Sequence, residues 1–451
     1  MRKRISAFFS VLAAIVLLTV PASAASSGST LKIICADAGQ VIFTPPGSTQ
    51  YAYRYGPAIL IDGDRIDIWA SAPPLVSNGV RYGNDSIEYI RSTDGGKTWT
   101  EWKTVLYPTL NSEDQWSTCD PGAFKYGDYY YVGYTGSPEF RTNPDKEKQV
   151  NNLFIARGKN PEGPYEKWNG NGWGGDPYAI TRYSGDGVGC SMPSFTVKGD
   201  TLYMYYVDQT HPDQDWNSEG NISVSTFSLK DPNWPGNELS NKMCENKPEE
   251  VRYCPDIDKF IGFQLKGGWD YDSYVEIYES TDGVNFTKTS SFRNNFPHYA
   301  HNIGISGNNL GQLDLSIQNY IGTAYTPTGV EAWWGHWHTQ LIPLYIREEQ
   351  PSSTTSSQPS GSTDSSSRKP TTSSVGSTDG ESSETEVSEP QNSNIESTVS
   401  DDKDKDKEVN NKTEQQEETS YLWLYIVIGA VVVLAGAGTA VYFLVIKKKH
   451  V

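Results

Sequence analysis

Short apolar and aromatic runs alternate with glycine-containing turns along the first 350 residues. Residues 117–136 show the pattern most clearly: an apolar run ends in the turn at 126–128, and an aromatic run follows at 129–134. Two such runs joined by a short turn predict a β-hairpin. The same arrangement recurs at 190–207, with its turn at 198–200. A hairpin repeated at this distance indicates an internal repeat, and the repeat decides the fold.

The repeat unit has four strands. In the first unit, runs around 57–61, 65–70, 86–91 and 101–106 predict four short antiparallel strands, which together form one blade of a β-propeller. Later units start near residues 121, 193, 255 and 302. We therefore predict an all-β, five-bladed β-propeller over residues 30–347, and a run at 31–35 or 40–43 is expected to close the ring as the outer strand of the last blade. A β-sandwich is the alternative, which the regular four-strand pitch disfavours.

The two ends of the chain have a different character. Residues 1–24, with a basic start, an apolar stretch and a small-residue end, predict a secretory signal peptide. Residues 350–420 are rich in Ser, Thr and Glu and predict a disordered stalk. Residues 421–446 are uncharged and long enough to span a bilayer, and the basic tail at 447–451 is expected on the cytoplasmic side. Together these segments predict a single-pass cell-membrane protein with an extracellular propeller.

The net charge and the cysteines limit the partners, disulfides and metal sites that the chain is expected to have. The formal net charge of −18 argues against a nucleic-acid partner. The number of cysteines is odd, so at least one must stay free or pair outside the chain, although an extracellular compartment permits disulfides. No Cys-x-x-Cys spacing supports a zinc site. Cys119, Cys190 and Cys254 each precede a proline by one to three residues. The sequence is compatible either with a disulfide between two of these cysteines or with free thiols. The cysteines are Cys35, Cys119, Cys190, Cys244 and Cys254.

Five repeated blades, with proline at the start of four of the predicted inner strands, resemble the family 43 glycoside hydrolases and the related arabinanase, levansucrase and invertase-type propellers. This resemblance covers about residues 53–347. Residues 92–99 also match the Asp-box of sialidases, a structural turn between the third and fourth strands of a blade, and residues 53–57 are distantly similar to a second sialidase signature. The resemblance implies a protein that acts on extracellular poly- or oligosaccharide.

In a propeller, the inner strands begin around the central axis, so the residue before each strand start can be compared across blades. These residues are Gly56, Asp120, Met192, Cys254 and His301. In the family pattern, the resemblance implies an Asp base, a variable residue, a second Asp, a Glu acid and a His at these places. His301 alone fits. Asp120 is a carboxylate at the variable place, and it is our candidate catalytic residue, with a plain turn carboxylate as the alternative.

Glycoside hydrolysis by the common mechanism requires two carboxyl groups on either side of the scissile bond. Asp85 and Asp272 are candidates for the second, because each directly precedes a third strand and so lies at the same face. Other acidic residues predicted at that rim are Glu139, Asp208, Glu219 and Asp256.

For substrate binding the candidates are Arg54, whose guanidinium suits a carboxylate, the rim residues Trp116 and Trp269, and the pair His301 and Asn302. No cofactor is expected, although a structural ion such as calcium in the central channel is compatible with the resemblance. The sequence thus predicts a cell-surface glycoside hydrolase-like propeller. The alternatives are a non-catalytic glycan-binding or adhesion propeller, and a structural display module without a polar, aromatic-lined site.

Overall fold

The computed structural model describes residues 29–46, 52–138, 140–143, 146–182, 188–210, 220–327 and 336–349. These residues contain β-strands and no helix, as the predicted all-β class requires. No described helix could therefore span a membrane. The predicted signal peptide, stalk, membrane segment and basic tail all lie outside the described residues.

Five four-stranded antiparallel units follow one another along the chain, and each is a blade numbered from its inner strand outward. Blades one and five are hydrogen-bonded to each other and belong to one nine-stranded sheet, which also includes β2. Blade one consists of β3 (Tyr55–Asp62), β4 (Arg65–Ala72), β7 (Ser86–Ser92) and β8 (Lys103–Leu106). Blade two consists of β9 (Ser117–Tyr126), β10 (Tyr129–Ser137), β13 (Asn152–Gly158) and β14 (Glu166–Lys167). Blade three consists of β15 (Gly189–Lys198), β16 (Thr201–Gln209), β17 (Asn221–Ser228) and β18 (Glu238–Met243).

Blade four consists of β19 (Glu250–Cys254), β20 (Lys259–Lys266), β21 (Tyr274–Ser280) and β22 (Thr287–Phe292). Blade five consists of β23 (Ala300–Gly307), β24 (Asn319–Tyr325), β25 (His338–Glu349) and β1 (Thr30–Cys35), with β2 (Gln40–Phe43) also paired to β25. Two small hairpins extend from blades one and two; they are β5–β6 (Leu75–Ser77, Val80–Tyr82) and β11–β12 (Phe140–Asn143, Lys146–Gln149).

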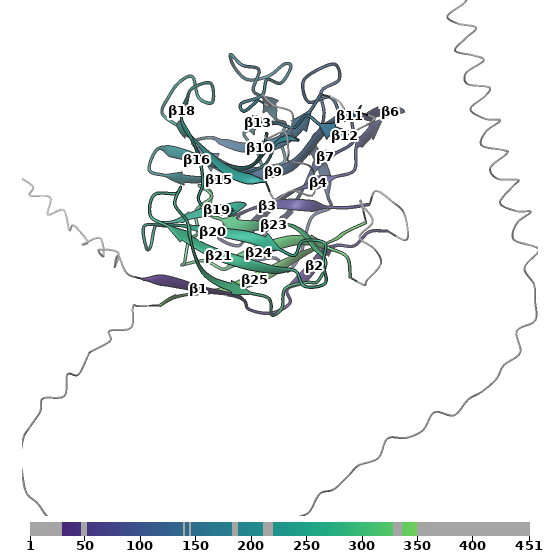
Figure 1. The fold of residues 1–451 in the computed structure, drawn as a ribbon. Helices are drawn as coiled ribbons and strands as arrows, with labels where there is room; N and C mark the ends of the chain where they lie inside the picture. The colour runs from purple at the N-terminus through teal and green to yellow at the C-terminus, as the bar shows by residue number, and fades with distance from the viewer. Residues whose placement is uncertain are drawn as a thin grey trace, which may run out of the picture. The chain divides into compact units, whose positions relative to one another are not determined.

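The five inner strands form a closed ring. Strands β3, β9, β15, β19 and β23 contact one another in chain order, and β23 returns to β3 through a short parallel ladder in which Ser306 pairs with Ile59 (Figure 1). A ring of five radially arranged four-stranded units is a five-bladed β-propeller. The predicted propeller is thus confirmed by the strand pairings themselves.

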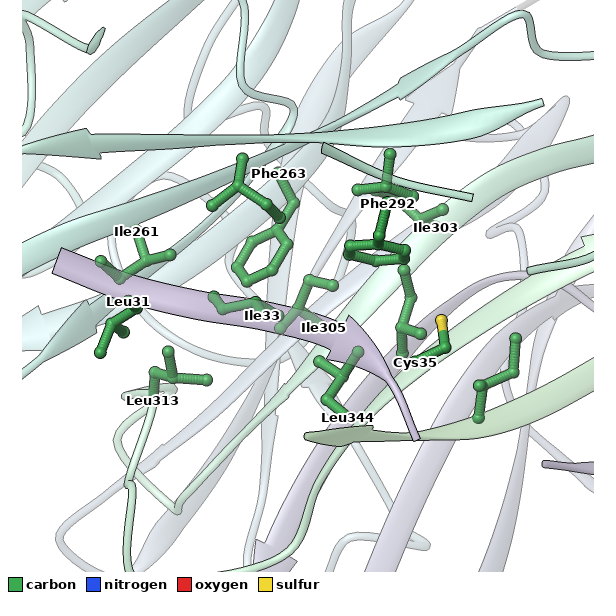
Figure 2. Packing of buried hydrophobic residues seen from close by; sticks show 14 of the residues in the cluster. Leu31, Ile33, Cys35, Ile261, Phe263, Phe292, Ile303, Ile305, Leu313 and Leu344 are labelled. Carbon is green, nitrogen blue, oxygen red and sulfur yellow. The ribbon is translucent and has the colours of Figure 1, made fainter. Parts of the chain in front are cut away.

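The N-terminal strand closes the ring. Strand β1 pairs antiparallel with β25 along its whole length, from Thr30 opposite Glu349 to Cys35 opposite Leu344. Its residues alternate between exposed and buried, and the buried side chains Leu31, Ile33 and Cys35 pack against blades four and five. Figure 2 shows these side chains among those of Phe263, Phe292 and Ile305. Burial of each large aliphatic side chain stabilises the folded state by about 1.5–3 kcal/mol. The packing of β1 therefore stabilises the contact between the N-terminal strand and the last two blades.

The inner strand of blade four differs from the sequence prediction. Cys254 does not start this strand; it is the last residue of β19, and residues 255–258 form the turn to β20. The Cys-Pro-Asp order at 254–256 resembles the Cys-Asp-Pro order at 119–121, and this similarity misplaced the blade by several residues. Cys254 therefore lies at the end of the inner strand opposite to the one predicted. All five cysteines are buried free thiols, so the disulfide alternative is not realised.

One end of the central axis is covered by residues 308–313, the first part of the connection from β23 to β24. Its backbone bonds to the backbone of three other blades, at Lys125, Val197 and Tyr253, and Asn309 also donates to the Asp62 carboxylate of blade one at 3.2 Å. We call this end the turn face, because the inner hairpins turn there. The opposite end, where the inner strands begin, is the start face, and it is where a functional site has to be sought.

Candidate functional site

Four inner strands carry a residue in the left-handed backbone region at the start face. The φ angles are 57° at Gly56, 48° at Asp120, 58° at Met192 and 57° at Asn302. The register between each inner strand and its neighbour shifts at these positions, as in a β-bulge. Bulges redirect side chains and are frequent next to functional sites. We call Gly56, Asp120, Met192 and Asn302 the axial cluster.

The axial cluster brings four blades together at one point. The Asn302 Nδ2 atom lies 3.4 Å from Asp120 Oδ1 and 3.9 Å from the Met192 sulfur. A Cβ atom added at Gly56 would lie 3.5 Å from both Asp120 Oδ1 and Asn302 Nδ2. The sequence prediction therefore placed Asp120 correctly at the axis, whereas in blade five the axial residue is Asn302 and not His301.

Asp120 is a half-buried carboxylate with neutral partners. Its backbone N–H donates to Ser71 Oγ at 2.7 Å, and the Cys119 thiol lies 3.5 Å from Oδ2. Burial raises the pKa of Asp120 to about 6, and the nearby Asp85 adds to the increase, while hydrogen bonds from Thr135 and Cys119 oppose it. The group therefore exchanges its proton close to neutral pH, which a carboxylate in water does not do.

Asp85, the first candidate for a second catalytic carboxyl, raises the pKa of Asp120 and accepts three hydrogen bonds from protein groups. It is buried and accepts hydrogen bonds from Tyr53 Oη at 2.5 Å, Ser117 Oγ at 2.9 Å and Asn84 Nδ2 at 3.2 Å. Burial raises the pKa of Asp85, and these donors act in the opposite direction. Asp85 therefore influences Asp120 electrostatically, but its oxygens are directed to neighbouring side chains.

Asp272 does not join the axial cluster. Its side chain is 87% exposed in the loop between β20 and β21, and it forms an ion pair with Arg293 at 3.6 Å. Of the other acidic candidates, Asp208 accepts a hydrogen bond from Ser223 at 3.1 Å, and Asp256 lies in the β19–β20 turn at the turn face. Glu139 and Glu219 lie outside the described residues.

An aromatic wall stands beside the axial cluster; it consists of Tyr55, Trp269, His301 and Trp337. The His301 ring lies 4.3 Å from that of Trp269, 4.2 Å from that of Trp337 and 5.4 Å from that of Tyr55, between centroids. Burial lowers the pKa of His301 to about 3, so the imidazole is neutral at physiological pH. Trp269 remains 37% exposed. His301 directly precedes Asn302 in sequence, and its ring packs against Trp269, which is the most exposed member of the wall because Tyr55 and Trp337 are buried.

Arg54, the candidate for binding a ligand carboxylate, has its guanidinium engaged by protein groups, and its role in ligand binding stays a prediction. Its guanidinium forms a salt bridge with Glu88 at 2.5 Å and lies 4.6 Å from the centre of the Phe43 ring. Glu88 lies on β7, the third strand of blade one, so the Arg54 guanidinium lies at that strand. Trp116 is half-buried directly before β9, where its backbone N–H bonds to the carbonyl of Ser137.

A carboxylate of blade four was missed by the sequence comparison. Glu250 lies on the inner strand two residues from Arg252, and their side chains form a salt bridge at 2.8 Å. Ser194 of blade three donates to Glu250 at 3.1 Å, while Arg252 donates to the carbonyl of Ile305 in blade five. The pair therefore bridges three blades. Acidic and basic residues at alternate positions of a short strand were the signal that could have indicated it.

The axial cluster does not fit the calcium ion that the fold resemblance allowed. Calcium takes six to eight oxygen ligands, whereas the cluster offers one carboxylate, one amide and a thioether. Among the described residues, no group of three or more His, Cys, Asp or Glu side chains gathers in a way that could hold a metal ion.

The turn at residues 92–99 lies between β7 and β8, on the outer part of blade one. Asp94 accepts hydrogen bonds from the backbone of Lys97 and Thr98, at 3.0 and 2.9 Å. Asp282 holds a similar turn in blade four, where it accepts from Val284 and Asn285. These carboxylates stabilise turns and take no part in the site.

Comparisons with known proteins give structural similarity without sequence similarity. Neither a protein-family profile nor a curated protein sequence matches this chain. Similar solved structures include an α-L-arabinofuranosidase from Podospora anserina in complex with cellotriose, at 12% identity and a TM-score of 0.45, covering 71% of this chain and 98% of that one. A family 117 glycoside hydrolase from Zobellia galactanivorans has 14% identity and a TM-score of 0.45, covering 71% and 90% of the two chains. The GH43_1 enzyme from Xanthomonas citri, complexed with xylotriose, has 12% identity and a TM-score of 0.45, covering 68% and 90%.

Proposed function

We propose that this protein binds extracellular saccharide at the start face of the propeller. One observation carries the proposal: the Asp120 carboxylate and the Asn302 amide, from two different blades, meet at the axis beside an aromatic wall with a partly exposed tryptophan. A carboxylate and an amide can each exchange hydrogen bonds with sugar hydroxyls. Flat aromatic faces match the apolar faces of sugar rings. A few convergent polar groups beside aromatic side chains are typical of ligand sites.

Hydrolysis of a glycosidic bond is the second candidate, and the pKa of Asp120 favours it. A carboxyl with a pKa of about 6 is suited to donate and accept a proton near neutral pH. The reaction also needs a second carboxyl facing the same bond, about 5–9.5 Å away. Among the described residues, the candidate that acts electrostatically on Asp120 is Asp85, and it already accepts three hydrogen bonds from protein groups. Binding is therefore the function that the geometry supports best.

Membrane anchorage is part of the same proposal and rests on the sequence. The uncharged run at 421–446 and the lysines that follow it would hold the propeller outside the cell, with residues 350–420 as a spacer. Extraction tests this directly: the full chain is expected in the membrane fraction after a carbonate wash and in the soluble fraction after detergent. Release by carbonate alone would contradict the anchor.

The binding proposal is tested with the full chain on a glycan array, together with chromogenic glycosides as hydrolysis substrates. Asp120→Asn is expected to weaken saccharide binding about tenfold or more, because a charge-assisted hydrogen bond is lost. Asp256→Asn at the turn face is the matched control and should bind as the wild type does. Binding by Asp120→Asn at wild-type affinity would refute the site. Cleavage by the wild type and none by Asp120→Asn would establish the second candidate in its place.

A further inference from the structure

A second exposed aromatic residue lies close in sequence to Trp269 of the aromatic wall. Tyr271, two residues beyond Trp269 in the loop between β20 and β21, is 59% exposed, so more than half of a large aromatic side chain faces solvent. Its ring stacks on that of His298, with centroids 3.9 Å apart and planes inclined by 15°. Tyr299 packs against its edge at 5.9 Å. Tyr271 is therefore an exposed aromatic residue with a supported ring.

This loop is held firmly to the start of β23. The Trp269 N–H donates to the carbonyl of Ala300, and the Tyr299 N–H donates to the carbonyl of Asp270, both at 2.9 Å. Trp269 and Tyr299 have φ angles of 71° and 53°, a region that costs bulky residues free energy. Such conformations persist where the surroundings impose them and are concentrated at ligand sites. The loop thus fixes two exposed aromatic residues in place, next to the strand that carries Asn302.

The arginines considered for this surface are engaged by protein groups, which favours an uncharged ligand. Recognition of an acidic sugar requires a cationic partner, commonly an arginine fork. Arg293 donates to the carbonyl of Tyr271 at 2.8 Å and pairs with Asp272. In the described part of the molecule the other arginines considered for the site, Arg54 and Arg252, are paired with Glu88 and Glu250.

We propose that Tyr271, supported by His298, is an outer stacking subsite for a neutral oligosaccharide whose inner end lies at the axial cluster. The proposal rests on the saccharide-binding function above and specifies its ligand: uncharged, and several sugar units long. Asp120 contacts Asn302, the preceding residue His301 packs its ring against Trp269, and Tyr271 lies two residues beyond Trp269 in the same loop. A single sugar at the axis would leave Tyr271 unused, whereas a longer chain would contact both places.

The experiment compares neutral and acidic glycans on the full chain. An array carrying xylan, arabinan and glucan oligosaccharides beside polygalacturonate and sialylated glycans identifies the class, and calorimetric titration with mono- to hexasaccharides of the strongest neutral ligand measures length dependence. For the wild type, affinity should rise with chain length. In Tyr271→Ala the increase should shrink about five- to tenfold for long ligands, with mono- and disaccharide affinity unchanged. Tyr271→Phe should keep the wild-type increase.

Tyr345→Ala is the matched control, because Tyr345 is an exposed tyrosine on β25, 49% exposed, outside the proposed site. Equal affinity for short and long ligands in the wild type, or an unchanged length dependence in Tyr271→Ala, would overturn the subsite while leaving saccharide binding intact. Preference for acidic glycans would overturn the assignment of a neutral ligand. Binding to none of the arrayed glycans would overturn both this inference and the proposed function.

Discussion

Asp120 and Glu250 are carboxylates on two inner strands, and they differ in the groups that they contact. Burial raises the pKa of both. Glu250 pairs with Arg252 at 2.8 Å and accepts a hydrogen bond from Ser194. Asp120 has amide, thiol and hydroxyl neighbours, and the nearby charge that raises its pKa is another carboxylate, Asp85.

The difference distinguishes a structural carboxylate from a functional one. An ionised group in a low-dielectric environment is costly unless it is paired. In Glu250 the charge is balanced inside the protein, and the pair joins blades three, four and five. No cation among the partners named above balances the charge of Asp120. Its carboxyl can therefore accept a hydrogen bond from a ligand hydroxyl or take up a proton. Unequal pairing of buried carboxyls is one signature of a functional site.

The largest effect is expected from breaking the structural pair. Arg252→Met keeps the aliphatic stem but leaves Glu250 buried without its cation, which typically costs about 3–5 kcal/mol. Urea unfolding of the full chain, followed by tryptophan fluorescence, measures this loss. The double variant Arg252→Met, Glu250→Gln should recover much of it, because no buried charge then remains. A loss below about 1 kcal/mol in the single variant would mean that Glu250 reaches water, and the contrast with Asp120 would fail.

Asp120→Asn should have the opposite effect on stability. The folded-state pKa is about 6 against the usual 3.8, so between these values the folded protein keeps a proton that the unfolded chain has released. Stability therefore falls as the pH rises from about 4 to 6, by up to about 3 kcal/mol. Asparagine cannot ionise, so the variant should be more stable than the wild type at pH 7, with the difference fading towards pH 4.

Chemical unfolding at several pH values measures that difference. Asp272→Asn is the control, because its side chain is exposed and its replacement should change the free energy of unfolding by less than about 0.5 kcal/mol. If Asp120→Asn is no more stable than the wild type at pH 7, the carboxylate is balanced by a partner and belongs in the same class as Glu250.

Sequence patterns predicted the parts of the molecule that local rules determine. The repeated hairpin at 117–136 and 190–207 predicted the blades, and the run at 31–35 or 40–43 was predicted to close the ring; both runs pair with β25. Proline after Asp120 marked the position where β9 reaches the axis. In blade five the bulge precedes Ile303 and not a proline, so the comparison selected His301 in place of Asn302. Asparagine tolerates a positive φ, and that preference was the missed signal.

Long-range contacts could not be predicted in this way. The bond from Arg54 to Glu88 and the bridge from Arg252 to Ile305 join residues far apart in sequence, and no spacing rule indicates them. The Cys-Pro-Asp order at 254–256 shows that a local motif can also give a wrong prediction. A local motif was repeated there in a turn, where the inner strand ends instead of beginning.

The finest test of the comparison uses two glycines with the same backbone angle. Gly56 and Gly127 both have a φ of 57°, so alanine at either position should cost about 1 kcal/mol of stability. At Gly127, in the β9–β10 turn, an added Cβ meets nothing within 4 Å, whereas at Gly56 it lies 3.5 Å from Asp120 Oδ1. A methyl group there occupies space beside the carboxylate that a sugar hydroxyl would need. Calorimetric titration should therefore show weaker saccharide binding in Gly56→Ala and wild-type binding in Gly127→Ala, with similar losses of stability in both. Equal saccharide affinities in the two variants would mean that the ligand does not contact Asp120. Asp120 would then have no binding role that distinguishes it from Glu250.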